Sequence, residues 1–175
     1  MSGSTGLKER VTNGKTIGFR WKYILLPVAI LLLSVILTAV YYGRLPDQVA
    51  YHFQSDGSPD RWTGRGTVIL WMLLPQLILA LIAVVTTWGM TLFGNRFKLQ
   101  ERTVMKPETV ILLMGNIITL PQLILCFAMA DIFSYNAYQI HLPSVWVFAL
   151  IVMAMGGVVI GFFFFRAIRQ VLRTR

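Results

Sequence analysis

Four long apolar runs constrain the fold of this chain more than any other feature of its sequence. They cover residues 23–42, 68–93, 110–133 and 145–165, and each is nearly free of charge. A helix of about 20 residues rises about 30 Å, which is the thickness of the hydrocarbon core of a bilayer. Because lipid offers no partner to a free backbone N–H or C=O group, a segment that crosses it has to be helical. The sequence therefore predicts an all-α membrane protein, a four-helix transmembrane bundle over residues 23–165.

The composition agrees with one small membrane bundle that has no separate soluble domain. Hydrophobic residues make up 56% of the 175 residues and charged residues only 13%, whereas soluble domains carry about a quarter charged residues. The single cysteine, Cys126, lies inside an apolar run. One cysteine excludes an intrachain disulfide and a multi-cysteine metal site, so Cys126 is interpreted as a small buried hydrophobe.

Lysine and arginine are distributed unequally around the four runs. Thirteen of the sixteen lie before the first run, between the second and third, or after the fourth. The remaining three are Arg44, Arg61 and Arg65. Because Lys and Arg are enriched in cytoplasmic segments, both termini are predicted to be cytoplasmic and residues 43–66 extracytoplasmic.

The net charge of +9 is thus explained by membrane orientation, and no nucleic-acid partner is expected. Residues 1–22 show no apolar periodicity and are predicted to form a mobile basic tail, and residues 166–175 form a second basic tail. Both tails are expected to meet anionic lipid at the cytoplasmic face of the bilayer.

Residues 43–66 form a polar island between the first two runs. The island holds three of the seven acidic residues and one of the two histidines. Val49, Tyr51 and Phe53 alternate with smaller or polar residues, which predicts a short extended segment. Residues 55–60 are Ser, Asp, Gly and Pro, which are typical of tight turns. An ordered extracytoplasmic loop between the first two helices is therefore expected.

The chemistry available in this loop is limited. His52 with Asp47, Asp56 or Asp60 offers a metal or proton site, but the regular ligand spacing of a zinc site is missing. No nucleophile–base pattern and no phosphate-binding glycine loop is evident. We therefore expect no metal, no cofactor and no enzyme activity. Two interpretations of the loop remain. It is either a rigid cap held together by turns and Asp–Arg pairs, or a binding surface for a peptide or another envelope protein.

Several polar residues and prolines lie within the apolar runs. Pro75 and Pro121 are expected to kink the second and third helices, because each removes a backbone hydrogen bond. Gln76 and Gln122 follow them directly, and Asn116 is nearby. Such groups normally bond to neighbouring helices. They are interpreted either as polar contacts that join the helices or as a polar pathway between the second and third spans.

Asp131 is the one acidic residue within an apolar run, near the outer end of the third span. A carboxylate at that depth requires a partner. The arginines on the same side, Arg44, Arg61 and Arg65, are the expected partners. Asp131 is interpreted as a clamp between loop and bundle rather than as part of a proton relay.

Gly157 and Gly161 form a G-x-x-x-G pattern in the fourth run. Glycines at this spacing let two membrane helices approach closely. The partner helix is either another span of the same chain or the same span of a second protomer, which would give a homodimer.

The polar island resembles a known family. The elements that carry the resemblance are Leu45-Pro46-Asp47, His52-Phe53 and Gly57-Ser58-Pro59-Asp60-Arg61-Trp62. Their order and spacing are similar to the pattern of a bacterial membrane domain of unknown function, which also forms the N-terminal part of SdpI-type immunity proteins. The resemblance covers approximately residues 24–133.

The resemblance implies a multi-span protein of the bacterial inner membrane. SdpI-type proteins protect the cell from a secreted toxic peptide and pass a signal to a cytoplasmic repressor. This chain departs from that type, because it has about four spans and no recognisable second half. The resemblance therefore implies the membrane domain more directly than the immunity role.

Three functions follow from these features. The leading one is a non-enzymatic protein of immunity or envelope sensing, whose outer loop meets a peptide or another envelope component. The second is a small transporter or accessory subunit with a polar crevice between spans two and three. The third is a structural assembly partner that associates through Gly157 and Gly161.

Overall fold

The computed structural model describes residues 18–54, 56–96 and 107–173. In chain order its elements are η1 (Trp21–Tyr23), α1 (Leu25–Tyr42), β1 (Gln48–Phe53), β2 (Pro59–Gly64), α2 (Arg65–Arg96), α3 (Pro107–Ile117), α4 (Thr119–Tyr138) and α5 (Val145–Arg173). Most of the predicted mobile tail, residues 1–17, lies outside the described residues.

Four helical segments are long and apolar enough to cross a membrane. They are Leu25–Tyr42, Arg65–Phe93, Glu108–Tyr138 and Val145–Arg166, and each contains most or all of one predicted apolar run. Their outer faces carry large apolar side chains that are more than half exposed, among them Leu81, Val85 and Leu150. An apolar surface of this extent is suited to lipid. The protein therefore has the architecture of a multi-pass membrane protein.

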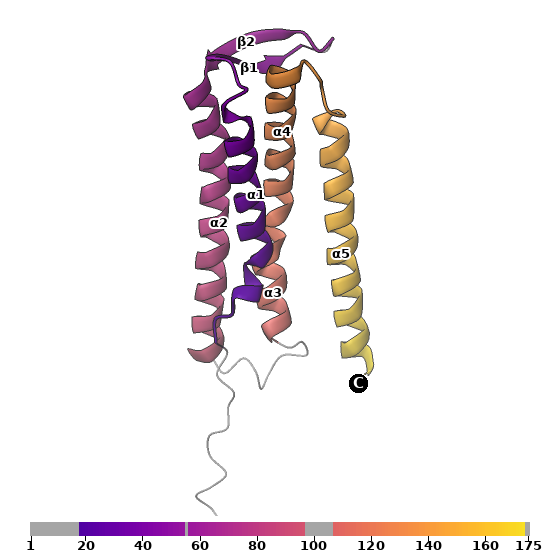
Figure 1. Ribbon diagram of the computed structural model, residues 1–175. Coiled ribbons are helices and arrows are strands. Elements are labelled where there is room, and N and C mark those ends of the chain that lie inside the picture. The colour runs from indigo at the N-terminus through magenta and orange to yellow at the C-terminus, as the bar shows by residue number, and fades with distance from the viewer. Residues whose placement is uncertain (1–17, 55, 97–106, 174–175) are drawn as a thin grey trace, which may run out of the picture.

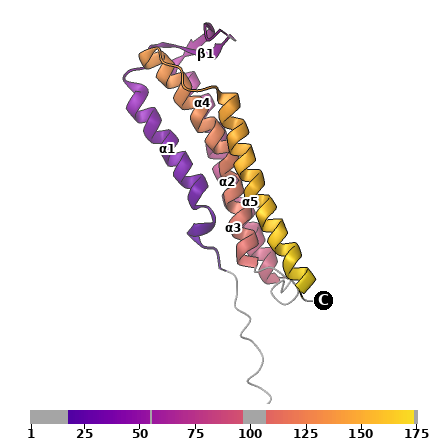
Figure 2. The same cartoon turned by 90° about the vertical axis from the view of Figure 1, so that its right-hand side faces the viewer.

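The long helices stand side by side, and the β-hairpin lies across one end of them (Figure 1). We call this the hairpin end. In the view turned by 90°, α1 and α5 lie on opposite sides of α4 (Figure 2). The helix α4 packs against α1, α2 and α5. The C-terminal end of α5 lies far from the hairpin, at the opposite end of the bundle (Figure 1).

The third predicted span consists of two helices. The helix α3 ends at Ile117 and α4 begins at Thr119. Pro121 has no N–H to donate to the carbonyl oxygen of Ile117 four residues earlier, which weakens the helix at this point. The helix α2, in contrast, continues through Pro75 without interruption. The sequence predicted a kink at both prolines, and the helix is interrupted at only one of them.

The predicted C-terminal tail begins as a continuation of a helix, because α5 extends to Arg173. The apolar run was expected to end at residue 165. The helix continues because residues 166–172 contain no glycine or proline that would stop it.

The purely helical fold class is corrected by the segment between α1 and α2, which holds a small antiparallel hairpin. In the hairpin, Ala50 lies opposite Trp62 and Phe53 opposite Pro59, with register shifts on either side of His52. Gly57 in the connecting turn has φ +85°, a left-handed conformation that glycine adopts without steric cost. The alternation of Val49, Tyr51 and Phe53 therefore marked a real strand.

Candidate functional site at the hairpin end

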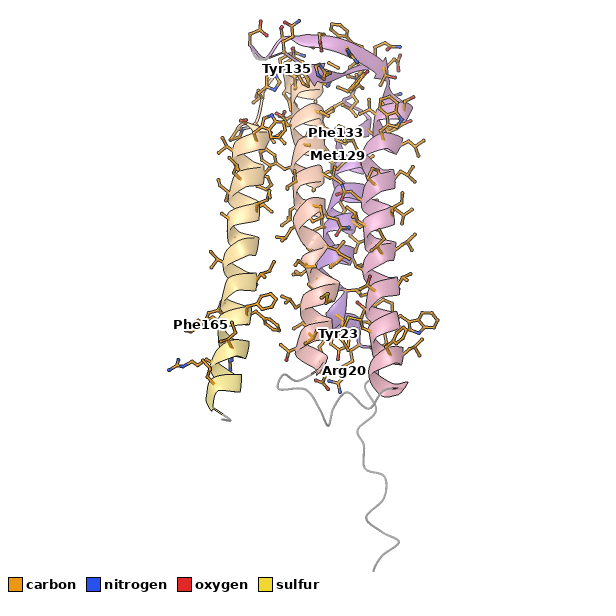
Figure 3. The ribbon with its side chains drawn as sticks, turned by 180° about the vertical axis from the view of Figure 1, so that it is seen from behind. Arg20, Tyr23, Met129, Phe133, Tyr135 and Phe165 are labelled. Atoms are coloured by element: carbon orange, nitrogen blue, oxygen red, sulfur yellow. The ribbon has the colours of Figure 1, made fainter. Side chains whose placement is uncertain are left out.

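We define the hairpin cap as residues 43–64. Its inner side packs on the bundle through a cluster of buried apolar side chains, which are Leu45, Val49, Val68, Met129, Ile132 and Phe133. Met129 and Phe133 lie on the upper half of α4, below the hairpin (Figure 3). Leu45 of the motif and Val49 of the predicted extended segment are thus core residues that attach the cap to the bundle.

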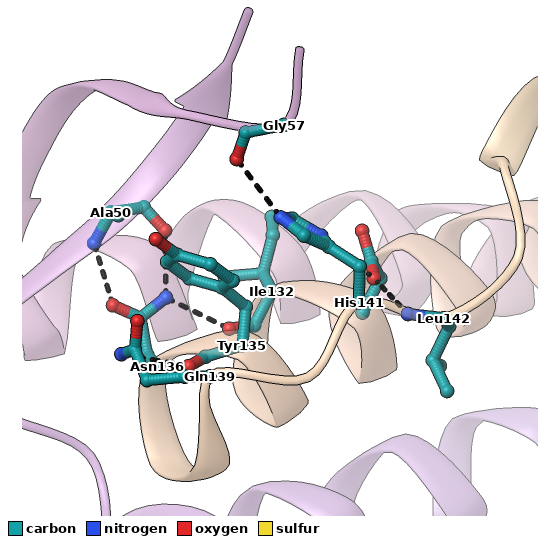
Figure 4. Close-up of polar contacts among 9 residues, drawn as sticks. Ala50, Gly57, Ile132, Tyr135, Asn136, Gln139, His141 and Leu142 are labelled. Carbon is teal, nitrogen blue, oxygen red and sulfur yellow. Dashed lines mark hydrogen bonds and ion pairs between the residues drawn. The ribbon is translucent and has the colours of Figure 1, made fainter.

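The outer edge of β1 is paired with a side chain of α4. The Asn136 side chain accepts a hydrogen bond from the Ala50 N–H at 2.8 Å and donates to the Ala50 carbonyl oxygen at 2.8 Å. Its amide nitrogen also donates to the Ile132 carbonyl oxygen (Figure 4). The amide thereby satisfies both backbone groups of a residue that is only 1% exposed. Sequence reasoning missed Asn136, because a single asparagine near a helix end gives no local signal of such a contact.

Arg65 joins the two ends of the hairpin cap. Its guanidinium lies 3.5 Å from the Asp47 carboxylate and donates to the carbonyl oxygens of Tyr42 and Leu45, each at 3.2 Å. It also lies over the Tyr42 ring, 4.6 Å from the centroid. The predicted Asp–Arg stitching of the loop is present in this pair.

His52 and Asp60 form a second pair, across the two strands. The distance between Nδ1 of His52 and Oδ1 of Asp60 is 2.6 Å, and the two side chains are 57% and 30% exposed. This contact joins the two strands of the hairpin, and the His52 ring remains exposed to solvent. Among the described residues, no group of three or more His, Cys, Asp or Glu side chains is placed to hold a metal ion.

The partners of Asp131 differ from the expectation. Its Oδ1 accepts a hydrogen bond from the Leu142 N–H at 2.7 Å and lies 3.5 Å from Nδ1 of His141. Of the three expected arginines, Arg65 pairs with Asp47, Arg44 donates to the Tyr138 hydroxyl at 2.6 Å, and Arg61 is exposed. Asp131 is a clamp, but it holds the connection between α4 and α5. The reason is that the short connection after α4 folds back over the end of that helix.

His141 links this connection to the hairpin. Its Nε2 lies 3.1 Å from the carbonyl oxygen of Gly57 (Figure 4). Gly57 lies in the turn that connects β1 to β2, which we call the distal turn. The ring stacks on Tyr135 with centroids 4.5 Å apart and meets the edge of Phe53 at 4.8 Å. Sequence analysis did not single out His141, because it lies in no recognisable pattern.

The distal turn is also ordered from within. Asp56 accepts hydrogen bonds from both the hydroxyl and the N–H of Ser58, at 2.7 and 2.9 Å. These bonds, that from the hydroxyl first, lower the pKa of the Asp56 carboxyl below its usual value.

The remaining motif residues differ in how far they are exposed. Arg61 and Trp62 on β2 are exposed, with Trp62 53% accessible, and Pro46 is exposed at the base of the cap. Pro59 is half-buried where β2 begins. The motif therefore contains a buried anchor, Leu45, and several exposed residues.

Within the bundle, three polar side chains form a buried layer. The Ser34 hydroxyl donates to Oε1 of Gln76 at 2.7 Å, and Nε2 of Gln122 donates to the backbone carbonyl oxygen of Gln76 at 3.1 Å. Both glutamines are 0% exposed. Nε2 of Gln76 and Oε1 of Gln122 have no hydrogen-bond partner among the described residues. The layer joins α1, α2 and α4, and its sealed packing disfavours the predicted polar crevice.

Asn116 performs a similar joining role toward the other end of the bundle. Its side-chain oxygen accepts the Leu26 N–H at 3.2 Å, and its nitrogen donates to the Leu112 carbonyl oxygen at 2.8 Å. The side chain therefore ties the beginning of α1 to α3.

Among the described residues, no neighbour packs on the two glycines of the G-x-x-x-G pattern. A Cβ atom added at Gly157 or Gly161 would meet no described atom within 4 Å. Gly156 is the glycine of α5 at the interface with α4, where a Cβ would lie 2.5 Å from Cδ1 of Leu120. Of the two expected partners, another span of the same chain is not found beside Gly157 and Gly161 among the described residues.

The fold and the cap together define a multi-pass membrane protein with a hairpin seated on one end of its bundle. The sequence model of a domain of unknown function, DUF1648, matches residues 29–75. This segment covers most of α1, the whole hairpin cap and the first part of α2. No curated protein and no solved structure matches the chain.

Proposed function

We propose that this chain is a non-enzymatic protein of a bacterial inner membrane, similar to SdpI-type proteins, that serves in immunity or envelope sensing. In this proposal both termini are cytoplasmic and the hairpin cap lies outside. The charge distribution supports the orientation, and the resemblance of the motif residues in the polar island supports the kind of protein.

One observation carries the functional part of the proposal. The hairpin cap is fixed to the bundle through Asn136 and Arg65, yet β2 exposes Arg61 and Trp62. An exposed tryptophan on a rigid support is typical of binding surfaces, in which Trp and Arg contribute most per residue. A secreted peptide or a neighbouring envelope protein is the partner that this face would meet.

The proposal is tested by expressing the chain in a sensitive bacterial host and adding a secreted toxic peptide of the kind that SdpI-type proteins neutralise. Expression is expected to raise survival, and Trp62→Ala is expected to reduce the protection by about tenfold, as loss of a binding hot spot would. Trp88→Ala is the matched control, because Trp88 is similarly exposed on α2 away from the cap. Lack of protection by the unaltered chain, or equal loss in both variants, would overturn the proposal.

A second function, that of an assembly partner, is favoured by the bare face of α5. Gly157 and Gly161 lie on that face without a neighbour within the described chain. A second copy of α5 would give them the close helix contact that this spacing favours. Crosslinking in native membranes is expected to yield a dimer that Gly157→Leu abolishes and Val147→Leu retains. If the unaltered chain is monomeric, the proposed role as an assembly partner is contradicted.

A further inference from the structure

The two edges of the hairpin differ in what lies beside them. The strand β1 lies on the end of α4, and β2 lies above it (Figure 1). Asn136 of α4 binds both backbone groups of Ala50 and so occupies the edge of β1. The elements that β2 mainly packs against are β1 and α2. The question is therefore which backbone groups β2 presents at its other edge.

The register of the hairpin gives the direction of these groups. In an antiparallel pair, two opposite residues either exchange both of their hydrogen bonds or both point their N–H and C=O groups away from each other. Ala50 points both groups away from β2, because Asn136 binds them. Trp62 is the residue opposite Ala50. Its N–H and C=O groups therefore point to the outer edge of β2, away from β1.

The contact at the base of the hairpin agrees with this alternation. The N–H of Arg65 donates to the carbonyl oxygen of Asp47 at 3.0 Å. Counting in steps of two from this bonded pair, Thr63 and Val49 form the next bonded pair, and Trp62 follows at an outward position. Among the described residues, the Trp62 backbone makes no hydrogen bond outside the hairpin. An unpaired N–H and C=O at a strand edge are a template for another strand.

The side chains of β2 indicate which extended segment fits this edge. Successive side chains of a strand point to opposite faces. Arg61 and Trp62 therefore lie on opposite faces of the hairpin, and both are exposed. Arg61 makes no ion pair among the described residues. A strand added here is best matched by an apolar side chain beside Trp62 and an acidic side chain, on the other face, beside Arg61.

We propose that the outer edge of β2 is a docking site for an extended peptide, which adds to the hairpin as a third strand. The peptide accepts a hydrogen bond from the Trp62 N–H and donates one to the Trp62 carbonyl oxygen. In this mode of recognition, main-chain bonds supply the affinity and side chains supply the specificity. The inference rests on the proposed function, in which the cap meets a peptide, and it adds how that peptide is recognised.

The test follows hydrogen exchange of backbone amides by NMR in the full chain, reconstituted in lipid nanodiscs. The probe is a short synthetic peptide in which Val and Thr alternate after an N-terminal Asp, because β-branched residues favour an extended chain. Without the peptide, the Trp62 N–H is expected to exchange at least about tenfold faster than the Thr63 N–H, which faces Val49. Saturating peptide is expected to slow exchange at Trp62 about tenfold and to leave Thr63 unchanged.

A second probe and two variants separate main-chain pairing from side-chain contact. The same peptide with every amide nitrogen methylated keeps its side chains but has no N–H to donate, and it is expected to give Trp62 no protection. Trp62→Ala removes the indole and keeps the backbone N–H, whereas Trp62→Pro removes both. Proline is tolerated at a strand edge where the N–H faces outward, so the hairpin is expected to persist. The Trp62→Pro protein is expected to bind the unmethylated peptide several-fold more weakly than the Trp62→Ala protein.

Three results would overturn the inference. The first is a slowly exchanging Trp62 N–H in the peptide-free chain, which would mean that the edge is already paired, for example with a second copy. The second is unchanged exchange at Trp62 with saturating peptide. The third is equal protection by the methylated peptide, or equal binding by the two Trp62 variants, because side chains alone would then hold the peptide. The proposed function fails separately, if Trp62 gains protection from the probe but the chain gives cells no protection from a toxic peptide.

Discussion

At the scale of single residues, the hairpin cap depends on side chains that replace missing backbone partners. Asn136 satisfies the N–H and the carbonyl oxygen of Ala50, which would otherwise be unpaired at a buried strand edge. An unsatisfied buried polar group costs more than the hydrogen bond contributes when it is formed. The amide of Asn136 is thus a structural substitute for a third strand.

Asn136→Ala is expected to lower the free energy of unfolding by about 2–4 kcal/mol, because two buried backbone groups lose their partners at once. Thermal unfolding in detergent micelles measures the effect. Gln48→Ala, on the exposed part of the same strand, is the control and is expected to change stability by less than about 0.5 kcal/mol. Equal behaviour of the two variants would contradict the role given to Asn136.

Two glycines of the cap segment offer a second comparison at this scale. Gly57 has φ +85°, whereas Gly43 has φ −74° and open space where a Cβ would be. Gly57→Ala is expected to destabilise by about 1–2 kcal/mol, the cost of a left-handed conformation for an L-residue. Gly43→Ala is expected to be neutral or slightly stabilising. Thermal unfolding of the two variants distinguishes these outcomes, and a reversed order would show that the turn adopts another conformation.

At the scale of elements, the bundle is joined by close backbone contacts at the end opposite the hairpin. Gly115 of α3 lies where a Cβ would overlap the backbone oxygen of Tyr23 and come within 2.7 Å of the Thr87 hydroxyl oxygen. Three segments therefore meet around a position that only glycine can occupy. They are the residues just before α1, the helix α2 and the helix α3.

Gly115→Ala is expected to destabilise the bundle by about 1–3 kcal/mol or more, because backbone atoms have to move apart. Gly89→Ala on α2 is the matched control, since nothing lies within 4 Å of its added Cβ. Alanine there is expected to stabilise slightly through its higher helix propensity. Unfolding midpoints in micelles test the pair, and a neutral Gly115→Ala would contradict the packing of these helices.

The elements that sequence predicted well are those with a local signal. The four spans were visible as apolar runs, β1 as an alternation at Val49, Tyr51 and Phe53, and the helix break as Pro121. The contacts of Asp131 had no such signal. The sequence indicated arginines as partners of Asp131 because their charge is opposite. The actual partners are determined by the path of the connection after α4, which folds back over the end of that helix. Contacts of this kind depend on tertiary geometry, which spacing in the sequence does not specify.

At the scale of the whole molecule, the structure has two different ends. The hairpin end is polar, stitched by Asp–Arg and Asp–His pairs, and seated on an apolar cluster. The opposite end holds η1 and the C-terminal part of α5, with Arg166 and Arg169. This polarity agrees with the proposed orientation, in which basic groups face the cytoplasm and the hairpin cap faces outward.

The proposed role of the cap depends on this orientation. The most direct test of the orientation is cysteine accessibility in intact cells. In a Cys126→Ala background, one variant carries Gln54→Cys and another carries a cysteine appended at the C-terminus. A membrane-impermeant maleimide is expected to label Gln54→Cys in intact bacterial cells and the appended cysteine only after permeabilisation. Protection of Gln54→Cys in intact cells, or labelling of the appended cysteine there, would contradict the account.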